Sequence, residues 1–202
     1  MKLYYAPGAC SLSAHIALCE AGLTFELEQV DLKTHRTATG HDFLAINPKG
    51  YVPALALADG QLLTEGAAIV QFVADQSPSR QLAPAPGSFD RVRLQEWLNF
   101  VSTEIHRGFS PLWNPKLPEA TRTAAVARLE RWFGWLDAQL ADHDYLMGQQ
   151  FTVADGYLFT ILNWANFLKM PLDRWPGLQR YMGRVQARPG VAAALAAEGL
   201  GG

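Results

Sequence analysis

The sequence predicts an α/β domain of element order βαβαββα followed by an all-α domain. Three observations indicate this fold class: strand-like and helix-like segments alternate as far as residue 75, a stretch rich in proline and glycine covers residues 77–88, and the pattern beyond it is helical. We expect the first domain over residues 1–80, a linker over 81–88 and the helical domain over 89–202.

The first domain is predicted to open with a βαβ unit. Residues 2–6 are expected to form a strand, residues 11–21 a helix stopped by Gly22, and residues 24–32 a second strand. Because βαβ connections cross over with a right hand, these two strands should be parallel. A short helical piece then ends at Asn47-Pro48.

The second half of this domain reads as a hairpin and a helix. Strands over residues 53–57 and 61–63 flank Asp59-Gly60, which is typical of a hairpin turn, and a helix follows over residues 65–75. The second domain is expected to have helices over residues 89–109, 119–141, 152–168 and 176–188. Thr152 and Asp155 resemble a capping box that helps to fold a buried helix.

Composition indicates a cytoplasmic enzyme. The chain has 202 residues, 49% of them hydrophobic, and a net charge of −2, so it can bury a sizeable core and has no basic excess for nucleic acid. No apolar stretch approaches the roughly 18 residues of a membrane span, and the start lacks the apolar core of a signal peptide. Without such a stretch we expect no membrane partner, and because the five histidines are scattered we expect no metal site.

Cys10 stands where the first strand becomes the first helix. Pro7 and Gly8 break the chain before it and Ser11 can cap the helix, so the thiol would face unpaired N–H groups and the positive end of the helix dipole. Such a place favours the thiolate, although an inert core cysteine is the alternative. Cys19 lies on an apolar helical stripe, where we expect core packing.

Two backbone sites accompany Cys10. At Glu65 and Gly66 a strand passes into a helix, whose free N–H groups could bind a carboxylate while the Glu65 side chain accepts an ammonium. Ordinary helix-start chemistry is the alternative. A cis bond between Val52 and Pro53 would turn the Val52 backbone outward toward an extended peptide, although a trans bond is the default.

The first helix of the all-α domain carries a polar face beside its core stripe. The stripe is formed by Leu94, Leu98, Val101 and Ile105. Asn99, Thr103 and His106 recur on a separate face at spacings of four and three. A neutral imidazole can act as a base for a thiol near pH 7, so this face is either functional or an ordinary solvated surface.

Several segments are weak motifs singly but specific in their order and spacing. They are Tyr4-Tyr5-Ala6-Pro7-Gly8-Ala9-Cys10-Ser11, Asn47-Pro48-Lys49-Gly50 before Val52-Pro53, Leu63-Thr64-Glu65-Gly66, the pair Glu104 and His106, and Phe151-Thr152-Val153-Ala154-Asp155. Over essentially its whole length the chain resembles the bacterial cytosolic glutathione S-transferases of the beta class. The resemblance implies a thioredoxin-like N-terminal domain, a homodimer and reduced glutathione as co-substrate.

The same resemblance implies a place for each part of glutathione. Its cysteinyl backbone would pair with Val52 ahead of a cis Pro53, and its sulfur would lie between Cys10 and His106, with Cys10 able to form a mixed disulfide. The γ-glutamyl end would be held by Glu65, Gly66 and Asn99, with Thr103 and Glu104 near the same end.

One position departs from the family pattern. Where related chains have a lysine toward the glycyl carboxylate, this sequence has His35, which is largely neutral at pH 7. The contact is then weaker or is made by a neighbour, Lys33 or Arg36.

The expected activity is conjugation of glutathione to hydrophobic electrophiles in detoxification, with Cys10 and His106 as catalytic residues. Phe109, Trp113 and Trp164 are candidates to contact the electrophile, with ordinary core packing as the alternative. Glutathione-dependent disulfide reduction through Cys10, isomerase or dehalogenase activity, and a non-enzymatic interaction role are the other functions open to this fold.

Overall fold

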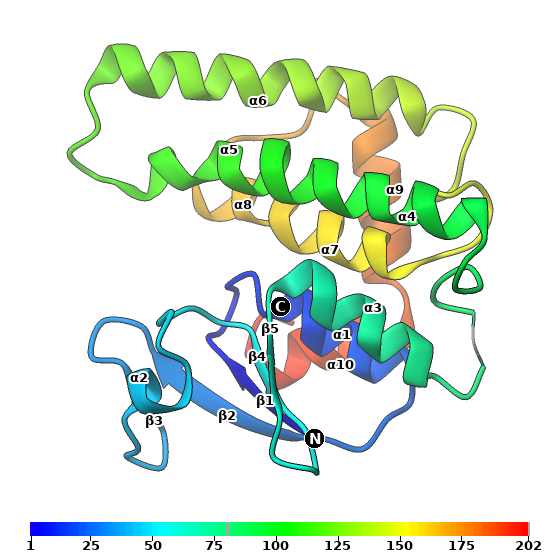
Figure 1. Ribbon diagram of the computed structural model, residues 1–202. Helices are drawn as coiled ribbons and strands as arrows, with labels where there is room; N and C mark the ends of the chain where they lie inside the picture. The colour runs from blue at the N-terminus through cyan, green and yellow to red at the C-terminus, as the bar shows by residue number, and fades with distance from the viewer. Residues whose placement is uncertain (80, 202) are drawn as a thin grey trace. The chain divides into compact units, whose positions relative to one another are not determined.

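The computed structural model describes residues 1–79 and 81–201, which divide into two compact units (Figure 1). One unit comprises Met1–Ala83 together with the chain from Arg188 onward, and the other is Pro84–Ala187. The sequence pattern grouped residues 89–202 together, whereas here the last helix, α10 (Pro189–Ala197), belongs to the first unit. No helix in the described part of the chain is both long and apolar enough to cross a membrane.

The first unit is built on a mixed sheet with the strand order β3-β2-β1-β4-β5. Its strands are β1 (Lys2–Tyr5), β2 (Glu26–Asp31), β3 (Arg36–Thr37), β4 (Ala54–Ala56) and β5 (Leu62–Thr64). As predicted, β1 and β2 are parallel and β4 and β5 form an antiparallel hairpin. The two-residue β3 was not predicted, because it is too short to show an alternating pattern.

Helices cover both faces of this sheet. On one face α1 (Leu12–Glu20) packs against α3 (Gly66–Gln76) and against α10, which lies beside it in Figure 1. Their apolar residues include Leu12, Ile16 and Ile69, all fully buried. On the other face lies α2 (Phe43–Ile46), whose Phe43 side chain packs in a core cluster with Val30, Val52 and Ala54. Burial of such side chains stabilises the sheet, whose β1 leads into the turn with Cys10 and whose β4 follows Val52 and Pro53.

The second unit is all-helical, as predicted. Its elements are α4 (Phe89–Phe100), the π-helix η1 (Val101–His106), α5 (Arg107–Phe109), the 3₁₀ turn η2 (Ser110–Trp113), α6 (Glu119–Gln139), α7 (Val153–Leu162), α8 (Trp164–Phe167) and α9 (Pro176–Gln186). The expected stripe of Leu94, Leu98, Val101 and Ile105 is buried.

The predicted capping box begins α7. Thr152 and Asp155 make its reciprocal contacts, and the Asp155 carboxylate also accepts hydrogen bonds from the Leu146 N–H at 2.8 Å and the Tyr181 hydroxyl at 3.2 Å. A carboxylate that is wholly buried needs such partners, so this network fixes where α7 starts.

Candidate active site

The turn between β1 and α1 carries Cys10. The Ser11 hydroxyl, which is fully buried, accepts a hydrogen bond from the Ala6 N–H at 3.1 Å and lies 3.3 Å from the Ala6 carbonyl oxygen. The Ser13 hydroxyl donates to the Cys10 carbonyl at 2.7 Å. Ser11 therefore ties the turn together and does not use its side chain to cap α1, which corrects the expectation from sequence.

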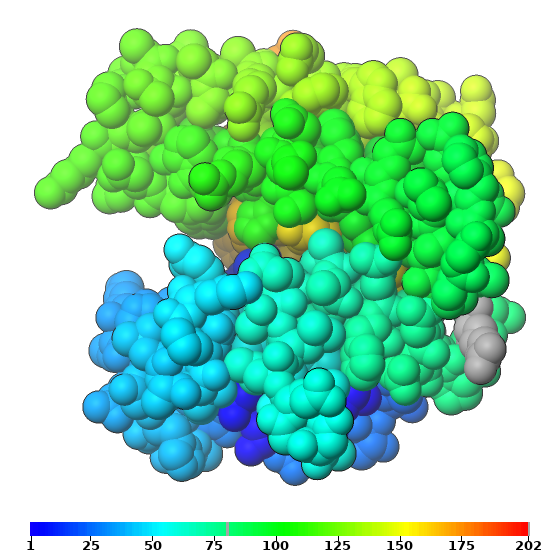
Figure 2. Space-filling model, in the orientation of Figure 1, coloured from blue at the N-terminus to red at the C-terminus, as the bar shows by residue number. Residues whose placement is uncertain are grey.

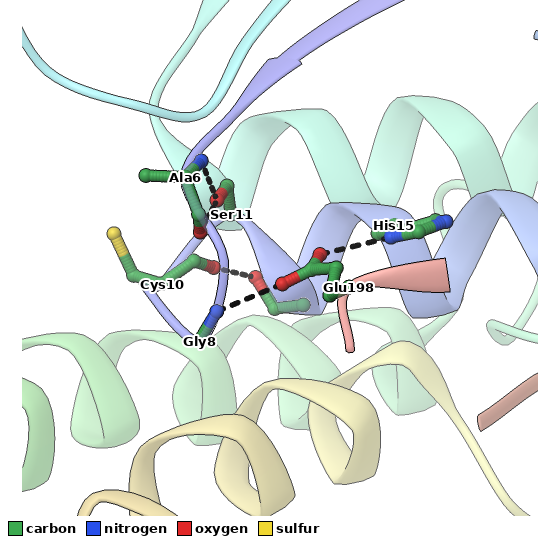
Figure 3. A network of polar contacts seen from close by, with 7 residues as sticks. Ala6, Gly8, Cys10, Ser11, His15 and Glu198 are labelled. Carbon is green, nitrogen blue, oxygen red and sulfur yellow. Dashed lines mark hydrogen bonds and ion pairs between the residues drawn. The ribbon is translucent and has the colours of Figure 1, made fainter. Parts of the chain in front are cut away.

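A carboxylate from the end of the chain supports the same turn. Glu198, directly after α10, accepts hydrogen bonds from the Gly8 N–H at 2.9 Å and lies 2.9 Å from His15 Nδ1 on α1, as Figure 3 shows. The side chains of Glu198 and His15 are almost completely buried. Sequence reasoning did not find Glu198, because no local pattern links residues 183 positions apart.

The thiol of Cys10 points to the backbone of Val52, two residues before β4. Its Sγ atom donates a hydrogen bond to the Val52 carbonyl at 3.1 Å, and the Val52–Pro53 bond is cis, as predicted. Burial raises the pKa of the Cys10 thiol to about 11, although the N–H groups of Cys10 and Ser11 act in the opposite direction. Burial thus outweighs the helix N-terminus, and the expected thiolate is replaced by a protonated thiol at neutral pH.

Glu65 and Gly66 lie at the start of α3. Glu65 has φ of +72°, a left-handed backbone conformation that is uncommon for a residue with a side chain and is often found at functional sites. Its carboxylate oxygen lies 2.6 Å from the ammonium of Lys49. A Cβ on Gly66 would lie 3.8 Å from Pro53 and from Ser13, so these residues are neighbours.

The ring of His35 packs on the turn that precedes Val52. Its Cε1 atom would lie 3.2 Å from a Cβ built on Gly50, and Gly50 itself has φ of +70°. The Nδ1 atom of His35 is buried without a hydrogen-bond partner among the residues that the structure describes. The predicted contact between His35 and a glycyl carboxylate stays a prediction.

In the second unit, the π-helix η1 carries three of the predicted site residues. Thr103 donates its hydroxyl to the Asn99 carbonyl at 3.0 Å, the Trp132 indole donates to Glu104 at 3.2 Å, and His106 Nδ1 lies 2.7 Å from the Tyr157 hydroxyl. Sequence reasoning found neither the π-helix nor the partners from α6 and α7. π-Helical turns often occur at functional sites, but they leave no signature in the apolar pattern.

Burial lowers the pKa of His106 to about 4, and the positive charge of Arg107 adds to this effect. Its imidazole is therefore neutral at pH 7. The ring lies edge-on to Trp164 with 5.0 Å between centroids, and Trp164 also meets Phe109 at 6.0 Å and Trp113 at 5.5 Å. Of the three aromatic candidates only Trp113 is exposed, by 46%, whereas Phe109 is fully buried.

Comparison with known proteins decides the family. Residues 8–76 match the sequence model of the glutathione S-transferase N-terminal domain, and residues 100–189 match that of the C-terminal domain. The chain belongs to the glutathione S-transferase family. It is 48% identical to the glutathione S-transferase GstA of Escherichia coli O157:H7, over 99% of this chain and 100% of that protein.

Solved glutathione S-transferases share the whole fold. A sphingomonad enzyme in complex with glutathione is 46% identical with a TM-score of 0.95, and a beta-class enzyme from Sphingomonas chungbukensis is 45% identical with a TM-score of 0.95. Each match covers 99% of this chain and 100% of the other. The family and the class predicted from the sequence are confirmed.

Proposed function

We propose that this glutathione S-transferase binds reduced glutathione and conjugates its thiol to electrophilic, mostly hydrophobic small molecules. The observation that carries the proposal is the gathering of Val52, Pro53 and Gly66 around the Cys10 turn, in the fold of a relative solved with glutathione. The reaction joins the glutathione sulfur to an electrophilic carbon, and the thiol proton leaves with the displaced group or with solvent.

The first unit offers groups for two parts of the tripeptide. The Val52 backbone is the proposed partner of the cysteinyl residue, which would place the ligand sulfur beside Cys10. The N-terminus of α3 at Gly66 suits the α-carboxylate of the γ-glutamyl end, and the Glu65 carboxylate suits its ammonium. We assign His35 to the glycyl end.

The second unit is proposed to contribute Asn99, Thr103 and Glu104 to the γ-glutamyl end and His106 to the sulfur. With a pKa of about 4, the imidazole of His106 is a weak base. We therefore assign it the donation of a hydrogen bond to the ligand thiolate and not the removal of a proton. Each unit by which the site lowers the pKa of the ligand thiol requires about 1.4 kcal/mol of preferential thiolate stabilisation. A homodimer and a cytoplasmic location are part of the same proposal.

Calorimetry with glutathione and an assay with an aromatic halide test the conjugation reaction. We expect binding at or below millimolar glutathione and release of halide that depends on it. Absence of both in the purified protein would overturn the proposal and leave a non-enzymatic role.

Thiol–disulfide exchange is a second candidate, favoured by the place of the Cys10 sulfur beside the Val52 backbone. Cys10 would attack the glutathione sulfur of a mixed disulfide, the substrate thiol would leave, and free glutathione would then resolve the Cys10 adduct to give oxidised glutathione.

Replacement of Cys10 by Ala separates the two reactions. Conjugation should persist in this variant, whereas disulfide reduction should fall to the background rate. Cys19→Ala is the matched control, because it removes the other thiol of the same unit, and it should retain both activities. Disulfide reduction that survives in the Cys10 variant would exclude the covalent route.

A further inference from the structure

The carboxylate proposed to receive the glutathione ammonium already holds an ammonium of the protein. Lys49 Nζ lies 2.6 Å from Glu65 Oε1 and 3.1 Å from the Thr64 hydroxyl oxygen. Both side chains are well exposed, by 52% for Lys49 and 69% for Glu65. The chain around them, drawn in cyan to teal, lies at the surface of its unit on the face shown in Figure 2. The pair is therefore open to displacement from solvent.

A rigid turn supports the backbone of Lys49. The Lys49 N–H donates to Asn47 Oδ1 at 3.2 Å, and the Asn47 amide donates in turn to the Tyr51 carbonyl at 2.8 Å. Asn47 is buried, and the Gly50 N–H bonds back to the Asn47 carbonyl at 2.9 Å. Since the backbone is tied in this way, movement of Lys49 away from Glu65 requires only rotation of its own side chain.

The two ammonium groups have the same chemistry. A lysine ammonium and the α-ammonium of a γ-glutamyl residue each donate three hydrogen bonds, carry one positive charge and repel one another at short range. We propose that Lys49 is an internal competitor for glutathione: it occupies Glu65 in the free protein and is displaced when the γ-glutamyl ammonium binds. This inference rests on the proposed function of Glu65.

Lys49 also has a role in the free protein on this view. The charge of Glu65 acts on the Cys10 thiol, whose pKa it raises, and Lys49 offsets that charge when no ligand is present. Ligand binding would exchange one ammonium for another at Glu65, so this carboxylate would have a positively charged partner in both states.

The test compares two lysine variants and two ligands by calorimetry. Lys49→Met removes the competitor, and Lys116→Met removes an exposed lysine of the other unit with the same change in net charge. The ligands are glutathione and glutaryl-cysteinyl-glycine, which is glutathione without its amino group. We expect Lys49→Met to lower the Kd for glutathione about two- to fivefold, the range for loss of an exposed ion pair. Lys116→Met should leave it unchanged.

The analogue without the amino group does not displace Lys49, so Lys49→Met should leave its Kd unchanged. When Glu65 is also replaced by Gln, Lys49→Met should no longer lower the Kd for glutathione. Equal or weaker glutathione binding by the Lys49 variant, with the unmodified protein still binding, would overturn the role of Lys49 alone. Absence of glutathione binding in the unmodified protein would overturn the proposed function and this inference together.

Discussion

The Sγ atom of Cys10 lies 3.1 Å from the carbonyl oxygen of Val52 and donates its proton to it. The thiol is therefore held beside the Val52 backbone, where the cysteinyl residue of glutathione is proposed to pair. Because the acceptor is a neutral carbonyl, the contact stabilises the thiol and not the thiolate, in keeping with a pKa of about 11.

Alkylation of Cys10 should consequently be slow at neutral pH. With a pKa of about 11, roughly one thousandth of the thiol is ionised at pH 8, and the rate of reaction with iodoacetamide should rise about tenfold for each pH unit up to that pKa. The measurement uses mass spectrometry on the Cys19→Ala variant, because burial also raises the pKa of Cys19 to about 11. A rate that is already constant above pH 9 would contradict the prediction.

The case of Cys10 shows what sequence could and could not predict about the site. The breaker residues Pro7 and Gly8 located the turn, whereas the cis bond at Val52–Pro53 and the role of Gly66 were expected from the family resemblance. The thiol pKa did not follow, since a helix N-terminus is visible in sequence whereas the burial that outweighs it depends on tertiary packing.

Glu198 is the clearest support for the Cys10 turn that sequence could not reveal. Replacing it by Met would remove the carboxylate that lies 2.9 Å from the Gly8 N–H and 2.9 Å from His15 Nδ1. A buried polar group that loses its partner costs about 1–3 kcal/mol, so Glu198→Met should lower the free energy of unfolding by that amount.

Urea denaturation followed by circular dichroism measures this loss. Glu26→Met is the matched control, since its carboxylate pairs with Lys2 on the same unit but is 74% exposed. An exposed pair contributes about 0–1 kcal/mol, so the control should change stability less. Equal losses of unfolding free energy in the two variants would show that the buried contacts of Glu198 stabilise the protein no more than an exposed ion pair does.

Gly66→Ala should leave the site intact. A Cβ there would meet Pro53 and Ser13 at 3.8 Å, which is ordinary contact, so a methyl group fits without movement of these neighbours. The substitution also restricts the conformations of the unfolded chain at a helical position, which stabilises the folded protein by about 0.4–1 kcal/mol. We expect a higher melting temperature and a Kd for glutathione within about twofold. A large loss of affinity would instead show that close approach of the ligand requires glycine.

The helical unit was predictable in outline, and its details were not. Apolar spacing found the core stripe through Leu98 and Ile105, and local chemistry found the Asp155 capping box. The π-helix that carries Glu104 and His106 inserts an irregularity into an otherwise regular run, so its partners Trp132 and Tyr157 could not be deduced from helical spacing.

His106 and Asp155 should give opposite slopes to the pH dependence of stability. The folded pKa of His106, about 4, lies below the ordinary 6.5, so the unfolded chain binds more protons between these values and stability falls as the pH is lowered through them. Burial raises the folded pKa of Asp155 from 3.8 to about 6, so the folded state binds more protons there and stability falls as the pH is raised.

The two contributions oppose each other between about pH 4 and 6, at up to about 1.4 kcal/mol for each pH unit.

His106→Gln removes the contribution that rises with pH. Relative to the unmodified chain, its unfolding free energy should therefore change in the downward direction as the pH rises from 4.5 to 6. Asp155→Asn, although less stable at every pH because two donors lose their acceptor, should show the reverse change of slope. Urea titrations at several pH values give these slopes. Subtracting the curve of the unmodified protein removes the contribution of the other carboxylates to the pH dependence. Parallel curves for all three proteins would show that neither buried group has the shifted pKa. The assignment of His106 as a weak base that donates a hydrogen bond would then lose its support.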